Sequence, residues 1–185
     1  MTLILAKWTL DEYHQLVAAG ILDDRKVELV RGDIVEMATE GELHAYSCHE
    51  SGEYLTQLMG EQASVRQAHP VTLPNASEPE PDLAIVQRLG REYRSHHPYP
   101  ENIFWIIEYA DSSLDKDLQV KSSVYAEVGI REYWVVNLKD MQLIVCRHPQ
   151  NSQYTTKTIL TTGTIQPLAF PNLEISVDRL LRSES

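Results

Sequence analysis

The sequence predicts a mixed α/β fold with one central sheet flanked by helices and an antiparallel β annex near the C-terminus. The run Ile103–Tyr109 is almost wholly apolar and rich in β-forming residues, which is typical of a strand covered on both faces. A helical pattern follows over Leu114–Val128, and a further strand pattern over Glu132–Asn137. This strand–helix–strand order predicts parallel pairing of the two strands.

Each element before this unit has its own local signal. Thr9 and Glu12 have the spacing of a capping box, and Arg31-Gly32 has the composition of a hairpin turn. In the second helix, small or apolar residues recur every three or four positions as a core-facing stripe: Ala45, Cys48, Gly52, Leu55 and Met59. The predicted elements are a helix to Ala19, a hairpin of Lys26–Val30 and Asp33–Met37, a helix over Leu43–Met59, and strands over Ala63–Ala68, Val71–Leu73 and Asp82–Val86.

The remaining segments are a polar loop and a set of short strands. Arg88–Asn102 contains two prolines and two histidines and is expected to be a loop with one short helical piece. The annex is expected to consist of three antiparallel strands followed by one helical turn. These elements are predicted over Gln142–Arg147, Gln153–Leu160, Leu173–Ile175 and Val177–Leu181.

Length and composition favour one domain spanning residues 1–185. The chain has 185 residues, with 43% hydrophobic residues, and no apolar run approaches the roughly 20 residues of a membrane span. Met1–Leu10 shows no secretory pattern, so a cytoplasmic location is expected. Cys48 and Cys146 are expected to be small buried hydrophobes rather than a disulfide.

The net charge of −11 is unfavourable for a protein that binds nucleic acid, because such binding draws mainly on Lys and Arg. Three alternatives follow from this charge. The partner is not a nucleic acid, or the basic residues gather on one face, or the acidic residues hold metal ions that meet the phosphates. The composition leaves all three open.

Two carboxylates occupy the ends of predicted strands. Asp82 follows Pro81 and opens an apolar run, and Glu108 ends the buried run that begins at Ile103. Strand alternation puts Glu108 on the same face as Ile106, where a carboxylate is costly unless it is paired or bound to a metal. The alternatives are that Asp82 is only a turn residue and that the strand reaches the surface at Glu108.

Lys121 interrupts an apolar helical stripe formed with Leu118 and Tyr125. A lysine in such a stripe must extend its amine to solvent or meet a buried anion. The alternative is an ion pair with Asp117 on a solvated face, worth only about 0.2–0.5 kcal/mol. Two carboxylates and a lysine in one place would suit a hard cation such as Mg²⁺ and the hydrolysis of a phosphodiester.

Several motifs in a fixed order resemble a known family. They are Val27–Met37 (VELVRGDIVEM), His44, Glu78–Leu83 (EPEPDL), Ile107–Ser113 (IEYADSS), Asp117 with Lys121, Tyr125-Ala126, Gly129–Val136 (GIREYWVV) and Phe170–Leu173 (FPNL). With this order and spacing the chain resembles the Uma2 family of endonucleases, within the PD-(D/E)xK nuclease superfamily. The similarity extends from Thr9 to Leu181.

The resemblance implies a restriction-endonuclease-like core in which Asp82 and Glu108 are ligands of Mg²⁺ or Mn²⁺. The wider superfamily has its lysine two residues after the second acid, a position that is Ala110 here. The resemblance implies that Lys121 replaces that lysine from the following helix.

Three further residues are implied as accessory. Glu28 is expected to complete an acidic cluster, or else to be a solvated strand residue. His44 is expected to face the site, or else to be an ordinary residue at a helix start. Asp117 matches the family pattern beside the catalytic lysine.

The leading hypothesis is therefore a metal-dependent endonuclease with DNA as its substrate and Asp82, Glu108 and Lys121 as catalytic residues. A second hypothesis is a non-catalytic protein-interaction module on a nuclease scaffold, which the charge of −11 and the missing local lysine favour. A third is a hydrolase acting on another phosphoester. A homodimer is compatible with either of the first two, through apolar segments near the C-terminus.

Overall fold

The computed structural model describes residues 5–111 and 113–182. Residues 1–4 and Ser112 lie outside the described residues. Residues 1–4 belong to the N-terminal stretch Met1–Leu10, and Ser112 belongs to the motif Ile107–Ser113. The helices and strands follow in the order α1 (Leu10–Ala18), β1 (Val27–Val30), β2 (Asp33–Glu36), α2 (Glu42–Met59), β3 (Ser64–Gln67), β4 (Leu83–Val86), η1 (Gly90–Arg94), η2 (Pro100–Asn102), β5 (Ile103–Ala110), η3 (Lys116–Lys121), α3 (Ser122–Glu127), β6 (Glu132–Asn137), β7 (Gln142–Gln150), β8 (Gln153–Leu160), β9 (Thr164–Ile165), β10 (Ile175–Ser176) and α4 (Val177–Arg182).

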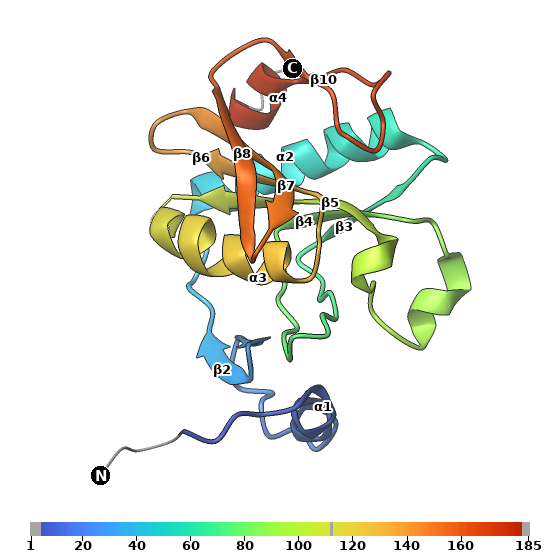
Figure 1. Ribbon diagram of the computed structural model, residues 1–185, viewed down its shortest axis with the longest axis vertical. Helices are drawn as coiled ribbons and strands as arrows, with labels where there is room; N and C mark the ends of the chain where they lie inside the picture. The colour runs from blue at the N-terminus through green and yellow to red at the C-terminus, as the bar shows by residue number, and fades with distance from the viewer. Residues whose placement is uncertain (1–4, 112, 183–185) are drawn as a thin grey trace.

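Six strands form a mixed central sheet in the order β3-β4-β5-β6-β7-β8. Within this sheet β5 and β6 pair in parallel and the other neighbours pair antiparallel. Helices α2 and α4 lie on one side of the sheet and α3 on the other (Figure 1). The predicted mixed α/β class and the parallel strand pair are therefore confirmed.

The antiparallel C-terminal strands are present, but they are arranged differently from the expected annex. β7 pairs with β6 and β8 pairs with β7, so both strands extend the central sheet. The separate part is the short two-stranded sheet of β9 and β10, next to the predicted final helical turn, α4. Which strands pair, and in which register, depends on packing between residues that are distant in the sequence. A local hydrophobic pattern does not specify this.

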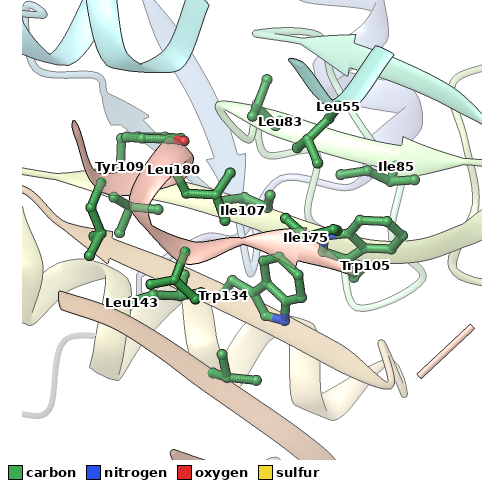
Figure 2. Close-up of a cluster of buried hydrophobic side chains, with 14 of the residues drawn as sticks. Leu55, Leu83, Ile85, Trp105, Ile107, Tyr109, Trp134, Leu143, Ile175 and Leu180 are labelled. Atoms are coloured by element: carbon green, nitrogen blue, oxygen red, sulfur yellow. The ribbon is translucent and has the colours of Figure 1, made fainter. Parts of the chain in front are cut away.

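One face of the sheet carries the larger aromatic core. Trp105 and Trp134 are fully buried there, with ring centroids 5.5 Å apart (Figure 2). Leu55 of α2 and Leu180 of α4 pack against the same cluster. Gly52 allows α2 to approach the sheet closely, because a Cβ at this position would overlap the Gln67 side chain of β3.

The opposite face is covered by α3. Val124 and Tyr125 pack against Ile106 and Val135 in a second buried cluster. Strand alternation places Glu108 on this face with Ile106, so its carboxylate points toward the η3–α3 segment. The second face therefore combines apolar packing with a buried acid.

The N-terminal elements match their local signals. α1 has the predicted capping box, in which Thr9 and Glu12 exchange hydrogen bonds. β1 and β2 pair around Arg31-Gly32, where both residues have positive φ, as two-residue hairpin turns of this kind require. The hairpin is anchored to the following loop by a hydrogen bond from the Glu78 N–H to the Leu29 carbonyl, 2.7 Å long.

Two local expectations were wrong, and a third was incomplete. Val71–Leu73 is buried but forms only an isolated bridge, between Leu73 and Ser77, since Pro70 interrupts the backbone before it. Ala45 is exposed, because the neighbouring His44, which contacts Asp82, occupies the inward side of the first turn of α2. The helix expected over Leu114–Val128 is present, but its part over Lys116–Lys121, η3, is π-helical.

Within the described residues, no helix combines the length and the apolar character needed to cross a membrane.

Leu55→Ala should lower the free energy of unfolding by about 2–5 kcal/mol, because it removes a fully buried side chain between α2 and the sheet. Urea denaturation measures this loss. Leu43→Ala, on the same helix but 57% exposed, is the matched control and should change the value by less than about 0.5 kcal/mol. Equal effects of the two substitutions would contradict this packing.

Candidate active site

The register of two antiparallel strands brings the predicted acids together. Leu83 of β4 pairs with Ile107 of β5, so the preceding residue, Asp82, lies beside Glu108. The Asp82 N–H donates to Glu108 Oε2 at 3.4 Å. Both carboxylates therefore belong to one end of the central strand pair, although 26 positions separate them in the sequence.

Asp82 is fixed by backbone and side-chain donors. Its Oδ2 accepts a hydrogen bond from the Tyr109 N–H at 2.6 Å and lies 3.2 Å from His44 Nε2. Its side chain remains 18% exposed, unlike that of Glu108. Burial acts to lower the pKa of His44, but the nearby Asp82 and Glu40 carboxylates outweigh that effect and raise it.

Glu108 is almost fully buried, with 2% exposure. Its Oε1 accepts hydrogen bonds from Lys121 Nζ and from the Tyr125 hydroxyl, both at 2.9 Å. Burial raises the pKa of Glu108, the Asp82 and Asp117 carboxylates add to the rise, and Lys121 opposes it. An additional cation beside Glu108 would lower this pKa and favour the ionised carboxylate.

Lys121 comes from the end of η3 and points into the sheet. Burial acts to lower the pKa of Lys121, but attraction to Glu108, Glu28 and Asp117 outweighs burial and raises it, so the amine is a permanent cation near neutral pH. Ala110, the position where a local lysine is missing, is fully buried on the same sheet face as Glu108. The amine therefore reaches Glu108 from the helix rather than from the strand.

The π-helical segment η3 aligns two lysines on the cleft. Hydrogen bonds between residues five apart bring Lys116 and Lys121 into line along such a segment. Lys116 Nζ lies 2.9 Å from Glu28 Oε1, and Lys121 Nζ lies 3.8 Å from Glu28 Oε2. Glu28 of β1 is fully buried, so the reading of Glu28 as a solvated strand residue was wrong.

Asp117 lies on the same segment and is 3% exposed. Its Oδ2 accepts a hydrogen bond from the Ser113 hydroxyl at 2.6 Å, and burial is the main cause that raises its pKa. No ion pair joins it to Lys121 on a solvated face among the described residues. Both side chains are turned toward the cleft.

These residues line one cleft of roughly 140 Å³. Seven of its lining side chains are carboxylates, and two are lysines. The carboxylates are Glu28, Glu40, Glu80, Asp82, Glu108, Asp111 and Asp117. The cleft is therefore strongly anionic, and burial together with Glu28 raises the pKa of Glu80.

The donor set suits a hard cation held partly by water and substrate. Among residues 5–111 and 113–182, no three His, Cys, Asp or Glu side chains are gathered so that they alone could hold a metal ion. Mg²⁺ is commonly bound by one or two carboxylates, with waters and phosphate oxygens completing its octahedron. Asp82 and Glu108 fit that requirement, because both present carboxylate oxygens and Asp82 is open to solvent.

All six residues singled out in the sequence (Glu28, His44, Asp82, Glu108, Asp117 and Lys121) line this cleft, although their roles stay predictions. Sequence reasoning missed Lys116, and it treated Tyr125 only as part of the apolar stripe. The Tyr125 hydroxyl contacts Glu108, and its position four residues after Lys121 was the available signal. His96 and His97, the two histidines of the segment Arg88–Asn102, are half-buried.

The comparisons with known proteins first define the fold. A crystal structure of "a putative nuclease belonging to DUF820" from Anabaena variabilis is similar, with a TM-score of 0.70 and 17% sequence identity. The match covers 93% of this chain and 96% of that chain. At this identity the likeness shows a shared fold.

The family follows from the sequence itself. The model of the Uma2 family, described as "Putative restriction endonuclease", matches residues 10–178. The chain therefore belongs to the Uma2 family, as its motifs predicted. No curated protein matches significantly.

Lys121→Met should make the protein progressively less stable than wild type as the pH rises from neutral to alkaline values. Without the lysine, the pKa of Glu108 rises further, so the folded variant keeps a proton that the unfolded chain releases. The difference in the free energy of unfolding between wild type and variant then widens by up to about 1.4 kcal/mol per pH unit. Urea denaturation near neutral pH and at about pH 9.5 measures it.

Two variants control this experiment. Adding Glu108→Gln to Lys121→Met removes the buried acid and should abolish the extra pH dependence. Lys139→Met, at an exposed turn, should behave like wild type. A difference in unfolding free energy between wild type and Lys121→Met that does not change with pH would contradict the Glu108–Lys121 pairing.

Proposed function

We propose that this protein is a Mg²⁺- or Mn²⁺-dependent endonuclease that hydrolyses DNA phosphodiester bonds. The observation that carries the proposal is that the buried Glu108 contacts both other residues predicted to be catalytic, Asp82 and Lys121. Glu108 accepts hydrogen bonds from the Asp82 N–H and from Lys121 Nζ. Membership of a family described as restriction endonucleases supports the same reaction class.

Asp82 and Glu108 would hold the divalent ion. Such an ion, when bound, would neutralise charge on the scissile phosphate and lower the pKa of the attacking water. His44 and the Tyr109 N–H both contact Asp82 Oδ2 and would orient its carboxylate. Fixed ligands of this kind lose little conformational freedom when the ion and the substrate arrive.

Lys121 would orient the attacking water and stabilise the charge that develops on the phosphate. Its amine donates to Glu108 and is also close to Glu28, so two acids fix its position. Asp117 and Glu28 help to keep the amine protonated. A permanently charged donor in a cleft with limited water interacts more strongly with a phosphate than it would in bulk solvent.

The alternative is a non-catalytic interaction module on the same scaffold. It is favoured by the net charge of −11 and by the absence of a lysine two residues after Glu108. A hydrolase acting on another phosphoester is a further alternative. A panel of plasmid, single-stranded DNA, RNA and small phosphodiesters separates these three proposals.

The proposal also covers domain organisation, location in the cell and oligomeric state. We propose one nuclease-like domain over residues 1–185, a cytoplasmic location and a homodimer. β8 ends the six-stranded sheet and carries Ile159, which is 53% exposed, so a second copy could pair along this edge. Sedimentation showing a monomer at micromolar concentration would contradict the dimer.

Asp82→Asn and Glu108→Gln should each lower plasmid cleavage by at least about 100-fold, since each removes a charged metal ligand. Lys121→Met should lower it by roughly 100- to 1,000-fold. Agarose gels with Mg²⁺, with Mn²⁺ or with EDTA measure the rates. Asp140→Asn, on the exposed turn after β6, is the matched control and should cleave like wild type. Metal-dependent cleavage that persists in Asp82→Asn would contradict the proposal.

Mn²⁺ should raise the thermal midpoint of the wild-type protein, because an ion that binds only the folded state adds about 2.7 kcal/mol at 100 times its Kd. EDTA should reverse the shift. Asp82→Asn should lose most of it, whereas Asp140→Asn should keep it. The same shift in all three proteins would place the ion elsewhere.

A further inference from the structure

The segment between β4 and β5 is basic in an otherwise acidic chain. Residues 87–97 contain three arginines and two histidines but a single acid, Glu92. Arg91 and Arg94 are exposed, and neither has an ion-pair partner among the described residues. Arg88, by contrast, pairs with Glu61.

Aromatic rings and cations alternate along this segment. The Arg66 guanidinium of β3 lies 5.4 Å from the centre of the Tyr93 ring. Tyr93 meets His96 edge-on at 5.9 Å, and His96 stacks on Tyr99 with centroids 4.7 Å apart and planes inclined by 14°. Tyr99 is 38% exposed. We call Arg66, Arg91, Tyr93, Arg94, His96 and Tyr99 the basic patch.

The cationic groups of the patch have unused donors. Arg66 Nε is buried without a hydrogen-bond partner among the described residues, and burial lowers the pKa of this guanidinium. The guanidinium groups of Arg91 and Arg94 are exposed, so their donors are open to an arriving anion. The patch is therefore suited to a ligand rich in negatively charged oxygens.

Two acids line a hollow beside the patch, and one of them, Glu78, is buried and hydrogen-bonded. A hollow of about 610 Å³ is lined by Arg94, His96 and Tyr99 together with Asp11 and Glu78. Glu78 is buried and accepts hydrogen bonds from the Thr72 hydroxyl at 2.6 Å and from His14 at 2.8 Å. Asp11 belongs to the first turn of α1, at the edge of this hollow.

The patch and the cleft lie on the same face of the sheet. Arg66 pairs directly with Ala84, and opposite residues in an antiparallel pair point to one side. Ala84 is two residues from Asp82 and therefore shares its face. The basic segment begins after β4, whose four residues span about 13 Å. A polymer could contact both regions, since consecutive phosphates of a strand follow each other every few ångströms.

We propose that the basic patch holds the phosphate backbone of the nucleic-acid substrate outside the acidic cleft. This inference rests on the proposed nuclease function and deepens it. The seven carboxylates of the cleft repel a polyanion, so attraction must come from another surface. Arg91 and Arg94 neutralise phosphates, and the exposed Tyr99 ring offers a face on which a base can stack.

The test measures DNA binding by fluorescence anisotropy over a series of KCl concentrations, with Ca²⁺ in place of Mg²⁺. The double variant Arg91→Ala/Arg94→Ala should raise the Kd for a duplex by about 10-fold or more. It should also reduce the slope of log K against log salt by about 1.8, as expected when two phosphate contacts are lost. The double variant Lys139→Ala/Lys157→Ala removes the same charge from exposed positions elsewhere and should bind like wild type.

Three results would overturn the inference. They are unchanged binding by the arginine variant, an equal loss in the lysine control, and no measurable DNA binding by the wild-type protein. Cleavage assays on the same proteins separate this inference from the proposed function. Wild-type cleavage that is unaffected in the arginine variant would refute the patch and leave the nuclease intact. Arginine-dependent binding without any cleavage would support the patch and refute the catalytic proposal.

Discussion

Glu108 and Lys121 form a buried ion pair on which the arrangement of the cleft depends. An isolated carboxylate in an apolar layer is strongly unfavourable, and removing one partner of such a pair typically costs about 3–5 kcal/mol. The Glu108–Lys121 contact at 2.9 Å, together with the Tyr125 hydroxyl, satisfies the acid. It also fixes the η3–α3 segment against β5, and thereby positions Asp117 and Lys116 on the cleft.

This arrangement combines a rigid strand pair with a helix that supplies charge. β4 and β5 bring Asp82 and Glu108 together through backbone register, which packing on both faces holds fixed. The hairpin adds Glu28, and α2 adds His44 from its first turns. The repulsion among the carboxylates of the cleft would destabilise the fold without nearby cations. The carboxylates that suit a metal ion therefore also require Lys116 and Lys121. The basic patch, on the same sheet face, supplies the opposite charge for a polyanion.

Much of this site could be predicted from the sequence, because its residues interrupt regular patterns. Glu108 ends an apolar strand and Lys121 breaks an apolar helical stripe, and both anomalies mark buried charges that need partners. Lys116 could not be found this way, since its approach to Glu28 depends on the π-helical turn of η3, which a 3.6-residue pattern does not indicate. The position of β7 and β8 in the central sheet was missed for a similar reason: pairing partners are set by long-range packing, not by strand periodicity.

The central claim is that Asp82 and Glu108 form the binding site for a catalytic divalent ion. Anomalous diffraction from crystals grown with Mn²⁺ tests it most directly, because the signal locates the ion without any assumption about activity. The account predicts a peak about 2.0–2.5 Å from carboxylate oxygens of both Asp82 and Glu108, with Lys121 within reach of a bound phosphate. A peak elsewhere, or none in this cleft at saturating Mn²⁺, would contradict it.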